Sequence, residues 1–235
     1  MVVKNVFLQA LLMTLLVFGI GLVFGLILEN NRSDKAEVAL LNSEVRALDQ
    51  QLRIKAVNDF NVSCNSAKES LFNFADDVYL EAKELELYYG SHKFKNTFEI
   101  LHKKYDLLRF MLWGESNNLR ERCGYSFHTA VYLYSYKTET LDKKAMQNYY
   151  SSFLTDFKNT YAENLFLLPM AADLNISSIE IAMEKYEIES LPVIILDDKY
   201  VISESDLTVM HDLMNGRGSY VGNNSSVRQI SYSFS

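Results

Sequence analysis

The sequence predicts an α/β domain of order βαβαββα, preceded by a transmembrane helix, a short coiled coil and an α-helical hairpin. Two observations carry this prediction. An uncharged run lies near the N-terminus, and from Phe127 onward the apolar residues change from a helical repeat to alternating strand-like and helical segments. The predicted parts are a cytoplasmic N-terminus (1–5), a transmembrane helix (6–28), a coiled-coil stalk (29–60), a helical hairpin (61–125), the α/β domain (126–215) and a flexible tail (216–235).

The apolar run from Val6 to Leu28 is long enough for a helix to cross a hydrocarbon core of about 30 Å. Its only clearly polar side chains are Gln9 and Thr14. A cleaved signal peptide is the alternative, but its apolar region usually has about 7 to 15 residues and is followed by small residues. Here the polar stretch from Glu29 to Arg32 follows. We therefore expect a retained, single-pass helix in a lipid bilayer.

Apolar side chains recur at intervals of 3 and 4 after this run, which is the a and d pattern of a short coiled coil. These residues are Val38, Leu41, Val45, Leu48 and Leu52. Within the run, Gly21 and Gly25 form a Gly-x-x-x-Gly pair that allows two helices to approach closely. The stripe can also pack on its own domain, and such glycines are common in membrane helices. Together, the two features favour a parallel homodimer in which both faces act in series.

Two helical arms follow the stalk and predict an antiparallel hairpin with its turn at Gly90 and Ser91. Ser66, followed by Glu69, has the spacing of a capping box and predicts the start of the first arm. The apolar positions with helical spacing are Leu71, Phe74, Val78, Leu85 and Tyr89 in the first arm and Phe94, Phe98, Leu101, Tyr105, Leu108 and Leu112 in the second.

The two cysteines of the chain flank this hairpin. Cys64 precedes the first arm and Cys123 follows the second, so folding the hairpin brings both sulfurs to the same end. A disulfide there would close a loop of about 60 residues and stabilise the fold by about 2 to 4 kcal/mol. Two separate buried thiols are the alternative. Because disulfides persist in oxidising compartments, the bridge predicts an N-terminus in the cytoplasm and a C-terminal domain outside it. The positive charges flanking the span are too evenly balanced to decide the orientation.

Acidic residues outnumber basic ones, with 30 Asp and Glu against 23 Lys and Arg and a net charge of −7. Binding of nucleic acid depends on clustered cations that neutralise phosphates. We therefore expect no nucleic-acid partner.

The C-terminal part alternates between the two periodicities. The expected strands are Phe127 to Tyr136, Asn164 to Met170, Val193 to Leu196 and Lys199 to Ser203, and the expected helices are Leu141 to Tyr161, Ser177 to Tyr186 and Glu204 to Met214. This alternation predicts a sheet with helices packed on its faces.

An acidic turn, a helix and an apolar strand that begins at a proline follow one another from Ala172 to Leu196, with Ile181 to Ile202 as the most specific piece. This pattern resembles the second half of the thioredoxin fold, over residues 127 to 215 and not over the hairpin. The resemblance implies that Pro192 is the cis-proline of that family, although a trans proline is also allowed at the start of a strand. It implies a binding surface that includes Lys137, Thr138, Leu191 and Pro192.

The chain departs from the family where redox-active members carry a Cys-x-x-Cys pair. The connection between the first strand and first helix reads Tyr136-Lys137-Thr138-Glu139-Thr140-Leu141-Asp142 and contains no sulfur. Dithiol chemistry needs a thiolate at this position. The resemblance therefore implies a fold without the family's redox activity.

No other chemistry is indicated by the sequence. The histidines and cysteines have no zinc-site spacing, and phosphate-loop and nucleophile motifs are lacking. Glu99 and His102 form one Glu-x-x-His pair, whereas a di-iron bundle needs two such pairs, so we interpret this pair as part of a solvated helix face. We expect no catalytic residue, no metal ligand and no cofactor.

The leading hypothesis is a non-enzymatic, extracytoplasmic scaffold or chaperone-like protein that binds an unidentified polypeptide. One alternative is an envelope thiol-disulfide oxidoreductase, or an accessory to one, that uses Cys64 and Cys123 as a labile pair. Another is a subunit of a larger membrane complex.

Overall fold

The computed structural model describes residues 3–60, 62–86, 95–138, 140–203, 207–216 and 227–230. The chain divides into two compact units, Met1–Leu52 and Arg53–Ser235, which are considered separately. The second unit contains the predicted hairpin and the predicted α/β domain together. The expected boundary near residue 125 therefore does not separate compact units, because a helix of the hairpin packs on the sheet.

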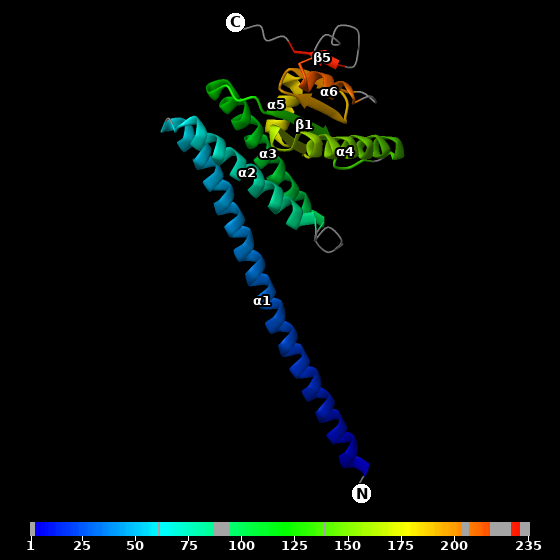
Figure 1. The fold of residues 1–235 in the computed structure, drawn as a ribbon. Coiled ribbons are helices and arrows are strands. Elements are labelled where there is room, and N and C mark those ends of the chain that lie inside the picture. The colour runs from blue at the N-terminus through cyan, green and yellow to red at the C-terminus, as the bar shows by residue number, and fades with distance from the viewer. Residues whose placement is uncertain are drawn as a thin grey trace. The chain divides into compact units, whose positions relative to one another are not determined.

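A single helix, α1 (Val3–Asp59), runs through the expected span and stalk (Figure 1). Its segment Val6–Ile27 has a mean hydropathy of 2.6 and is not covered by any other part of the chain. In the part of the chain that the structure describes, this is the one helix long and apolar enough to cross a membrane.

Helices α2 (Cys64–Glu86) and α3 (Lys95–Cys123) form the hairpin. Their apolar faces are buried as the helical spacing predicts, at Leu71, Phe74, Val78, Tyr105, Leu108 and Leu112. The expected turn at Gly90 and Ser91, and the side chains of Leu85, Tyr89, Phe94 and Phe98, lie outside the described part of the chain.

The first arm begins earlier than the sequence predicts. Helix α2 starts at Cys64, and the Ser63 hydroxyl accepts a hydrogen bond from the Ser66 backbone N–H at 3.3 Å. Ser63 therefore caps the helix, and Ser66 is its third residue instead of its cap. The capping-box prediction is wrong by three residues because both serines have hydroxyls that can serve as caps.

Five strands form one mixed sheet in the order β2-β1-β3-β4-β5. The strands are β1 (His128–Tyr134), β2 (Leu165–Ala171), β3 (Val193–Leu196), β4 (Tyr200–Ile202) and β5 (Val227–Gln229). Strands β1 and β2 are parallel, and the other three pairs are antiparallel. Strand β3 is completely buried and β1 is buried except at its two end residues, because helices cover both faces of the sheet.

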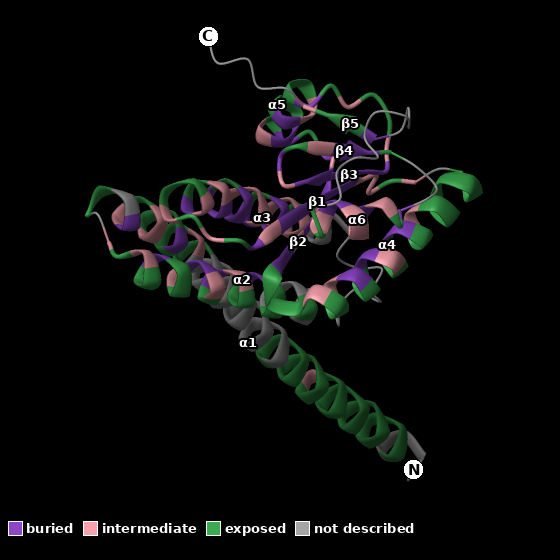
Figure 2. Cartoon of the chain, turned by 45° about the horizontal axis from the view of Figure 1, so that its top comes forward, coloured by how far each residue is buried: buried purple, intermediate pink, exposed green. Residues whose placement is uncertain are grey.

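The helices lie in two layers on opposite faces of the sheet (Figure 2). Helix α4 (Leu141–Tyr161), followed by a 3₁₀ turn (Ala162–Asn164), and helix α6 (Val209–Met214) contribute to a core with β1, β3 and β4. Helix α3 packs against β1, β2 and α5 (Ser177–Lys185). The second arm of the hairpin is therefore a layer of the α/β domain.

Strand β5 corrects the expectation of a flexible tail for residues 227–229, and most of the rest of 216–235 lies outside the described part of the chain. Val227 is buried and pairs with Ile202, and Arg228 donates a hydrogen bond to the Glu187 carbonyl at 3.1 Å. The strand covers an otherwise open edge of β4. Three residues, two of them polar, are too few for alternation to reveal a strand.

Candidate functional site

Two loops and the residues before β3 meet at one edge of the sheet, which we call the carboxyl edge (residues 135–138, 140–141, 172–176 and 190–192). The parallel strands β1 and β2 end side by side at Tyr134 and Ala171. Antiparallel β3 begins at Val193, opposite Leu133. The loops that follow β1 and β2 therefore lie at the same edge as the Leu191–Pro192 peptide bond, which is cis.

The loop after β1 is held by a carboxylate from the loop after β2. Asp173 accepts hydrogen bonds from the backbone N–H groups of Tyr136 at 2.6 Å and Lys137 at 3.1 Å. Bonds of this kind to a charged acceptor are stronger than bonds between neutral groups. Asp173 thus fixes the backbone of the loop after β1 at Tyr136 and Lys137.

Helix α4 holds the same loop from the other side. The Gln147 side chain accepts from the Ser135 backbone N–H at 3.4 Å and donates to the Ser135 carbonyl at 3.0 Å. The Thr138 hydroxyl lies 3.1 Å from the Ser135 carbonyl and 3.2 Å from the Gln147 amide oxygen. Thr140 then caps α4 by accepting from the Lys143 backbone N–H. The backbone of this loop is therefore preorganised.

Helix α3 places a polar cluster beneath the carboxyl edge. The buried Asp106 carboxylate accepts from the Ala171 backbone N–H at 3.1 Å and from Arg109 at 3.3 Å. His102 Nε2 shares a hydrogen bond of 2.8 Å with the Tyr134 hydroxyl and lies 3.5 Å from Asp106. These contacts attach α3 to the ends of both parallel strands.

Burial governs the charge of this cluster. It raises the pKa of Asp106 to about 7, although Arg109 and the Ala171 N–H act in the opposite direction. Burial, assisted by the Arg109 charge, lowers the pKa of His102 to about 4. At neutral pH the imidazole is therefore uncharged, and its contact with Asp106 is not a pair of full charges.

The structure places the predicted surface residues at this edge, but it does not expose them equally. Lys137 is exposed and forms an ion pair of 3.0 Å with Glu99. Leu191 is half-buried and Pro192 is buried. The accessible part of the edge is consequently the loop after β1 together with the start of α4, where Leu141 is 85% exposed.

Glu99 and His102 do not form the solvated face that the sequence suggests. The His102 side chain is only 14% exposed and its ring packs on Tyr136, with ring centroids 4.6 Å apart. The face is covered because α3 docks against the loop after β1. Among the described residues, no three His, Cys, Asp or Glu side chains are grouped so as to hold a metal ion.

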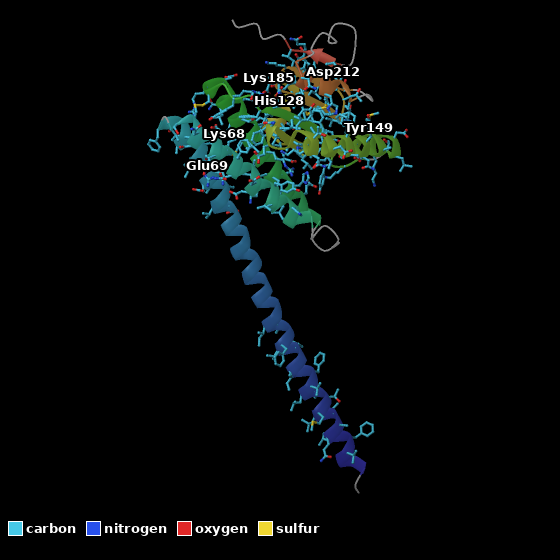
Figure 3. All side chains as sticks on the ribbon, viewed as in Figure 1. Lys68, Glu69, His128, Tyr149, Lys185 and Asp212 are labelled. Atoms are coloured by element: carbon cyan, nitrogen blue, oxygen red, sulfur yellow. A yellow bond between two sulfur atoms is a disulfide. The ribbon has the colours of Figure 1, made fainter. Side chains whose placement is uncertain are left out.

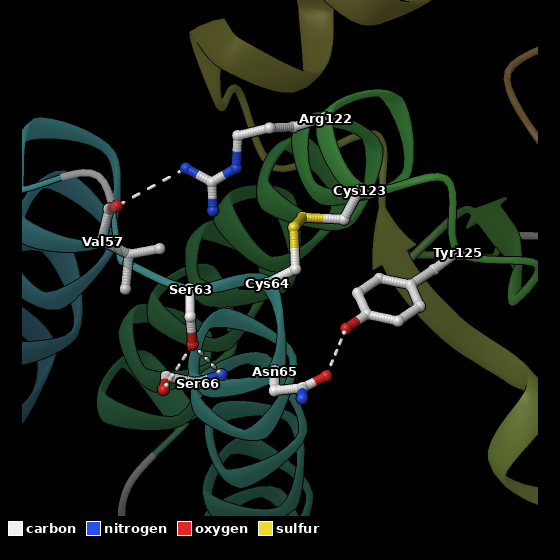
Figure 4. The surroundings of a disulfide bond; sticks show 8 residues. All are labelled: Val57, Ser63, Cys64, Asn65, Ser66, Arg122, Cys123 and Tyr125. Atoms are coloured by element: carbon white, nitrogen blue, oxygen red, sulfur yellow. Dashed lines mark hydrogen bonds between the residues drawn. A yellow bond between two sulfur atoms is a disulfide. The ribbon is translucent and has the colours of Figure 1, made fainter.

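The two cysteines lie at the opposite edge of the sheet, which we call the amino edge (residues 123–128 and 197–199). Cys64 and Cys123 are joined by a disulfide, with their Cα atoms 5.8 Å apart (Figure 4). Beside it, Tyr125 donates a hydrogen bond to Asn65 at 3.2 Å. The bridge therefore fixes the start of α2 to the end of α3, five residues before β1 begins.

A charged network attaches α3 to the turn between β3 and β4. Arg120 donates to Asp197 at 2.8 Å and to Asp198 at 3.0 Å, and His128, labelled in Figure 3, lies 2.6 Å from Asp197. Burial alone would raise the pKa of Asp197, but hydrogen bonds from His128 and the Thr129 N–H and the nearby charges hold it below the ordinary value.

Asp198 completes this network. Its carboxylate accepts from Trp113 at 2.8 Å and from the Tyr186 hydroxyl at 2.7 Å. Both turn aspartates have positive φ, 53° and 59°, a conformation that Asp tolerates better than most residues. The network connects α3, the turn and the end of α5.

The sequence identified the carboxyl edge but not the residues that build it. Asp173 stands in the acidic turn that carries the family resemblance, so a signal existed for it. Gln147 and Asp106 gave no signal, because their partners Ser135 and Ala171 lie 12 and 65 residues away in the sequence.

Comparisons of the chain with protein-family models, curated proteins and solved structures found no match. The structure by itself defines a mixed five-stranded α/β domain preceded by a long apolar helix. A function for this chain must therefore be argued from the residues of the carboxyl edge and their contacts.

Proposed function

We propose that this chain is a membrane-anchored, extracytoplasmic binding protein. Its thioredoxin-like domain lacks redox activity and offers the carboxyl edge to a polypeptide. Residues Tyr136, Lys137, Thr138, Thr140 and Leu141 form the accessible part of the binding surface. The domain acts as a scaffold or chaperone-like module and not as an enzyme.

The strand order supports the thioredoxin-like assignment. Two parallel strands joined through α4 stand beside two antiparallel strands, with β1 and β3 central. Pro192 stands immediately before the buried strand β3, as the resemblance requires. A polypeptide at this edge would meet the preorganised loop after β1.

The positions of the sulfurs support the lack of redox activity, and this is the observation that carries the proposal. Residues 135–141 contain no cysteine, and Cys123 lies before β1 whereas this loop lies after it. The seven-residue strand β1 separates them by about 20 Å at 3.3 Å per residue. A substrate at the carboxyl edge would not reach the disulfide.

Helix α1 supports the anchoring part of the proposal. A core helix of a soluble protein would be mostly buried, whereas Val6–Ile27 is uncovered along its length. A disulfide in the following domain is expected where the environment is oxidising.

Site-specific photocrosslinking tests the binding surface. A photoreactive residue at Lys137 should give one defined adduct with another polypeptide in native membranes. The matched control is Lys199, exposed at the amino edge, where no such adduct is expected. Equal adducts at both positions, or no adduct at Lys137, would contradict the proposal.

Redox titration separates this function from the oxidoreductase alternative. A structural bridge between Cys64 and Cys123 should have a reduction potential below about −300 mV. A markedly more oxidising potential would favour a labile, catalytic pair.

A further inference from the structure

We propose that Asn175 is an N-glycosylation site, so that the protein carries an oligosaccharide on the loop after β2. The proposal rests on the extracytoplasmic part of the proposed function, because this modification belongs to exported chains. It does not depend on what binds at the carboxyl edge.

Asparagine accepts a glycan in the pattern Asn-x-Ser or Asn-x-Thr, in which the middle residue is not proline. The chain contains this pattern at Asn31, Asn61, Asn175, Asn223 and Asn224. Asn61, Asn223 and Asn224 lie outside the described part of the chain. The pattern alone selects none of the five, because it also arises by chance, but the backbone distinguishes Asn175 from Asn31.

The backbone around Asn175 places both functional residues of the pattern on one side. Asn175 has a φ of 55°, in the left-handed region that Asn tolerates better than most residues. Ile176, the middle residue, has extended backbone with φ −103° and ψ 107°. In extended backbone, neighbouring side chains point in opposite directions and side chains two residues apart point the same way. Asn175 and Ser177 therefore share a side, and Ile176 faces away from both.

Burial agrees with this placement. Asn175 and Ser177 are exposed, whereas Ile176 between them is only 8% exposed. The isoleucine anchors the turn in the protein interior and leaves the acceptor amide and the hydroxyl at the surface. The loop thus carries a sugar without displacing any part of the core.

The same pattern at Asn31 has a different backbone. Asn31 and Ser33 lie within α1, and positions two residues apart in an α-helix are separated by about 200° around its axis. The helix therefore does not bring the two positions to one side. The side chain of Asn31, like those of Val38 and Leu41 in the predicted stripe, lies outside the described part of the chain.

The sugar donor is an oligosaccharide joined to a membrane lipid through a phosphate or diphosphate. Transfer forms a bond between the Asn175 amide nitrogen and the anomeric carbon of the sugar, and it breaks the bond between that carbon and the lipid phosphate oxygen. The lipid phosphate leaves with the electron pair, and the amide nitrogen gives one proton to a base of the transferase. The pattern requires the Ser177 hydroxyl for this transfer.

Mass analysis of the full chain, taken from its own membrane, tests the site. Trypsin should release residues 159–185 as one peptide, because no Lys or Arg lies between Lys158 and Lys185. This peptide also contains Asn159 and Asn164, neither of which has Ser or Thr two residues later. We expect the peptide to carry the added mass of an oligosaccharide, and fragmentation to locate that mass on Asn175. An unmodified peptide, or a sugar on Asn159 or Asn164, would overturn the proposal.

Variants of Ser177 test whether the pattern directs the transfer. Ser177→Ala removes the hydroxyl and should abolish the added mass, as should Asn175→Gln, whereas Ser177→Thr keeps a hydroxyl and should retain the mass. An intact disulfide between Cys64 and Cys123 shows that each variant has folded. A sugar that persists in Ser177→Ala would refute a pattern-directed site.

The outcomes also separate this inference from the proposed function. If Asn175 is unmodified while Cys64 and Cys123 are recovered as a disulfide and Lys137 gives its defined adduct, the glycosylation site is wrong and the proposed function stands. If Asn175 is unmodified and both cysteines are free thiols, the extracytoplasmic placement is wrong as well.

Discussion

Arg120 of α3 and Asp198 of the turn between β3 and β4 are joined by a hydrogen-bonded ion pair of 3.0 Å across 78 residues of sequence. The same guanidinium also binds Asp197 at 2.8 Å. Because these three side chains are mostly buried, removing the arginine leaves two carboxylates without their cation.

We therefore expect Arg120→Ala to lower the free energy of unfolding by about 2 to 4 kcal/mol. Lys103→Ala is the control, because its ion pair with Glu99 is considerably more exposed and should cost less than about 1 kcal/mol. Denaturant unfolding of the full chain in nanodiscs measures both. A similar small loss in the two variants would show that the network does not hold α3 to the sheet.

Replacing both Cys64 and Cys123 with serine should lower the free energy of unfolding by about 2 to 4 kcal/mol. The bridge spans a sequence separation of 59, so its removal frees a long loop in the unfolded chain. The difference in free energy of unfolding between the double variant and the wild-type protein should disappear when both are unfolded under reducing conditions. A double variant as stable as the oxidised protein would indicate that the bridge is not structural.

Asp106→Asn should stabilise the protein relative to wild type as the pH rises from about 4 to about 7. The folded-state pKa of Asp106, about 7, is above its ordinary value of 3.8. The stability that this carboxyl contributes is therefore fully present only below about pH 4 and is lost as the pH rises to about 7. The difference in free energy of unfolding should grow by at most about 1.4 kcal/mol per pH unit. A difference that does not change with pH would contradict the buried setting of this carboxyl.

His102→Gln should show the opposite slope. The folded-state pKa of His102, about 4, is below its ordinary value of 6.5, so its contribution is present above about pH 6.5 and is lost as the pH falls towards 4. The variant lacks this loss and should gain stability relative to wild type on acidification. Parallel pH series of the two variants measure both slopes, and slopes of the same sign would refute the assignment.

Asp173→Ala should free the loop after β1. Without the carboxylate, the N–H groups of Tyr136 and Lys137 lose their acceptor, so their hydrogen exchange should accelerate by about ten-fold, the equivalent of about 1.4 kcal/mol. Exchange in β3, at Ile194 and Ile195, serves as the internal control. Unchanged exchange at residues 136 and 137 would mean that another group orders the loop.

Local periodicity predicted most elements closely. Helix α4 and strand β3 have the predicted bounds, and β1 and β2 differ from prediction by one or two residues at their ends. Their apolar spacing is strong because helices cover both faces of the sheet. Strand β5 escaped prediction because two of its three residues are polar and exposed.

Contacts between residues far apart in the sequence could not be predicted from local periodicity. The role of α3 as a layer of the sheet depends on Trp113 and Arg120 meeting Asp198, 85 and 78 residues away. Similarly, Asp106 reaches the Ala171 N–H across 65 residues. The disulfide is also a long-range contact, but the sequence could predict it. The chain has only two cysteines, and they lie at matching ends of the predicted hairpin, so a single pairing within the chain is possible.

Mass mapping of the protein, taken from its own membrane and alkylated before any reduction, tests most directly the claim that this domain is an extracytoplasmic module without an active dithiol. We predict that Cys64 and Cys123 are recovered as one linked pair, with neither sulfur alkylated. Alkylated thiols, or a mixed disulfide between either cysteine and another protein, would contradict it.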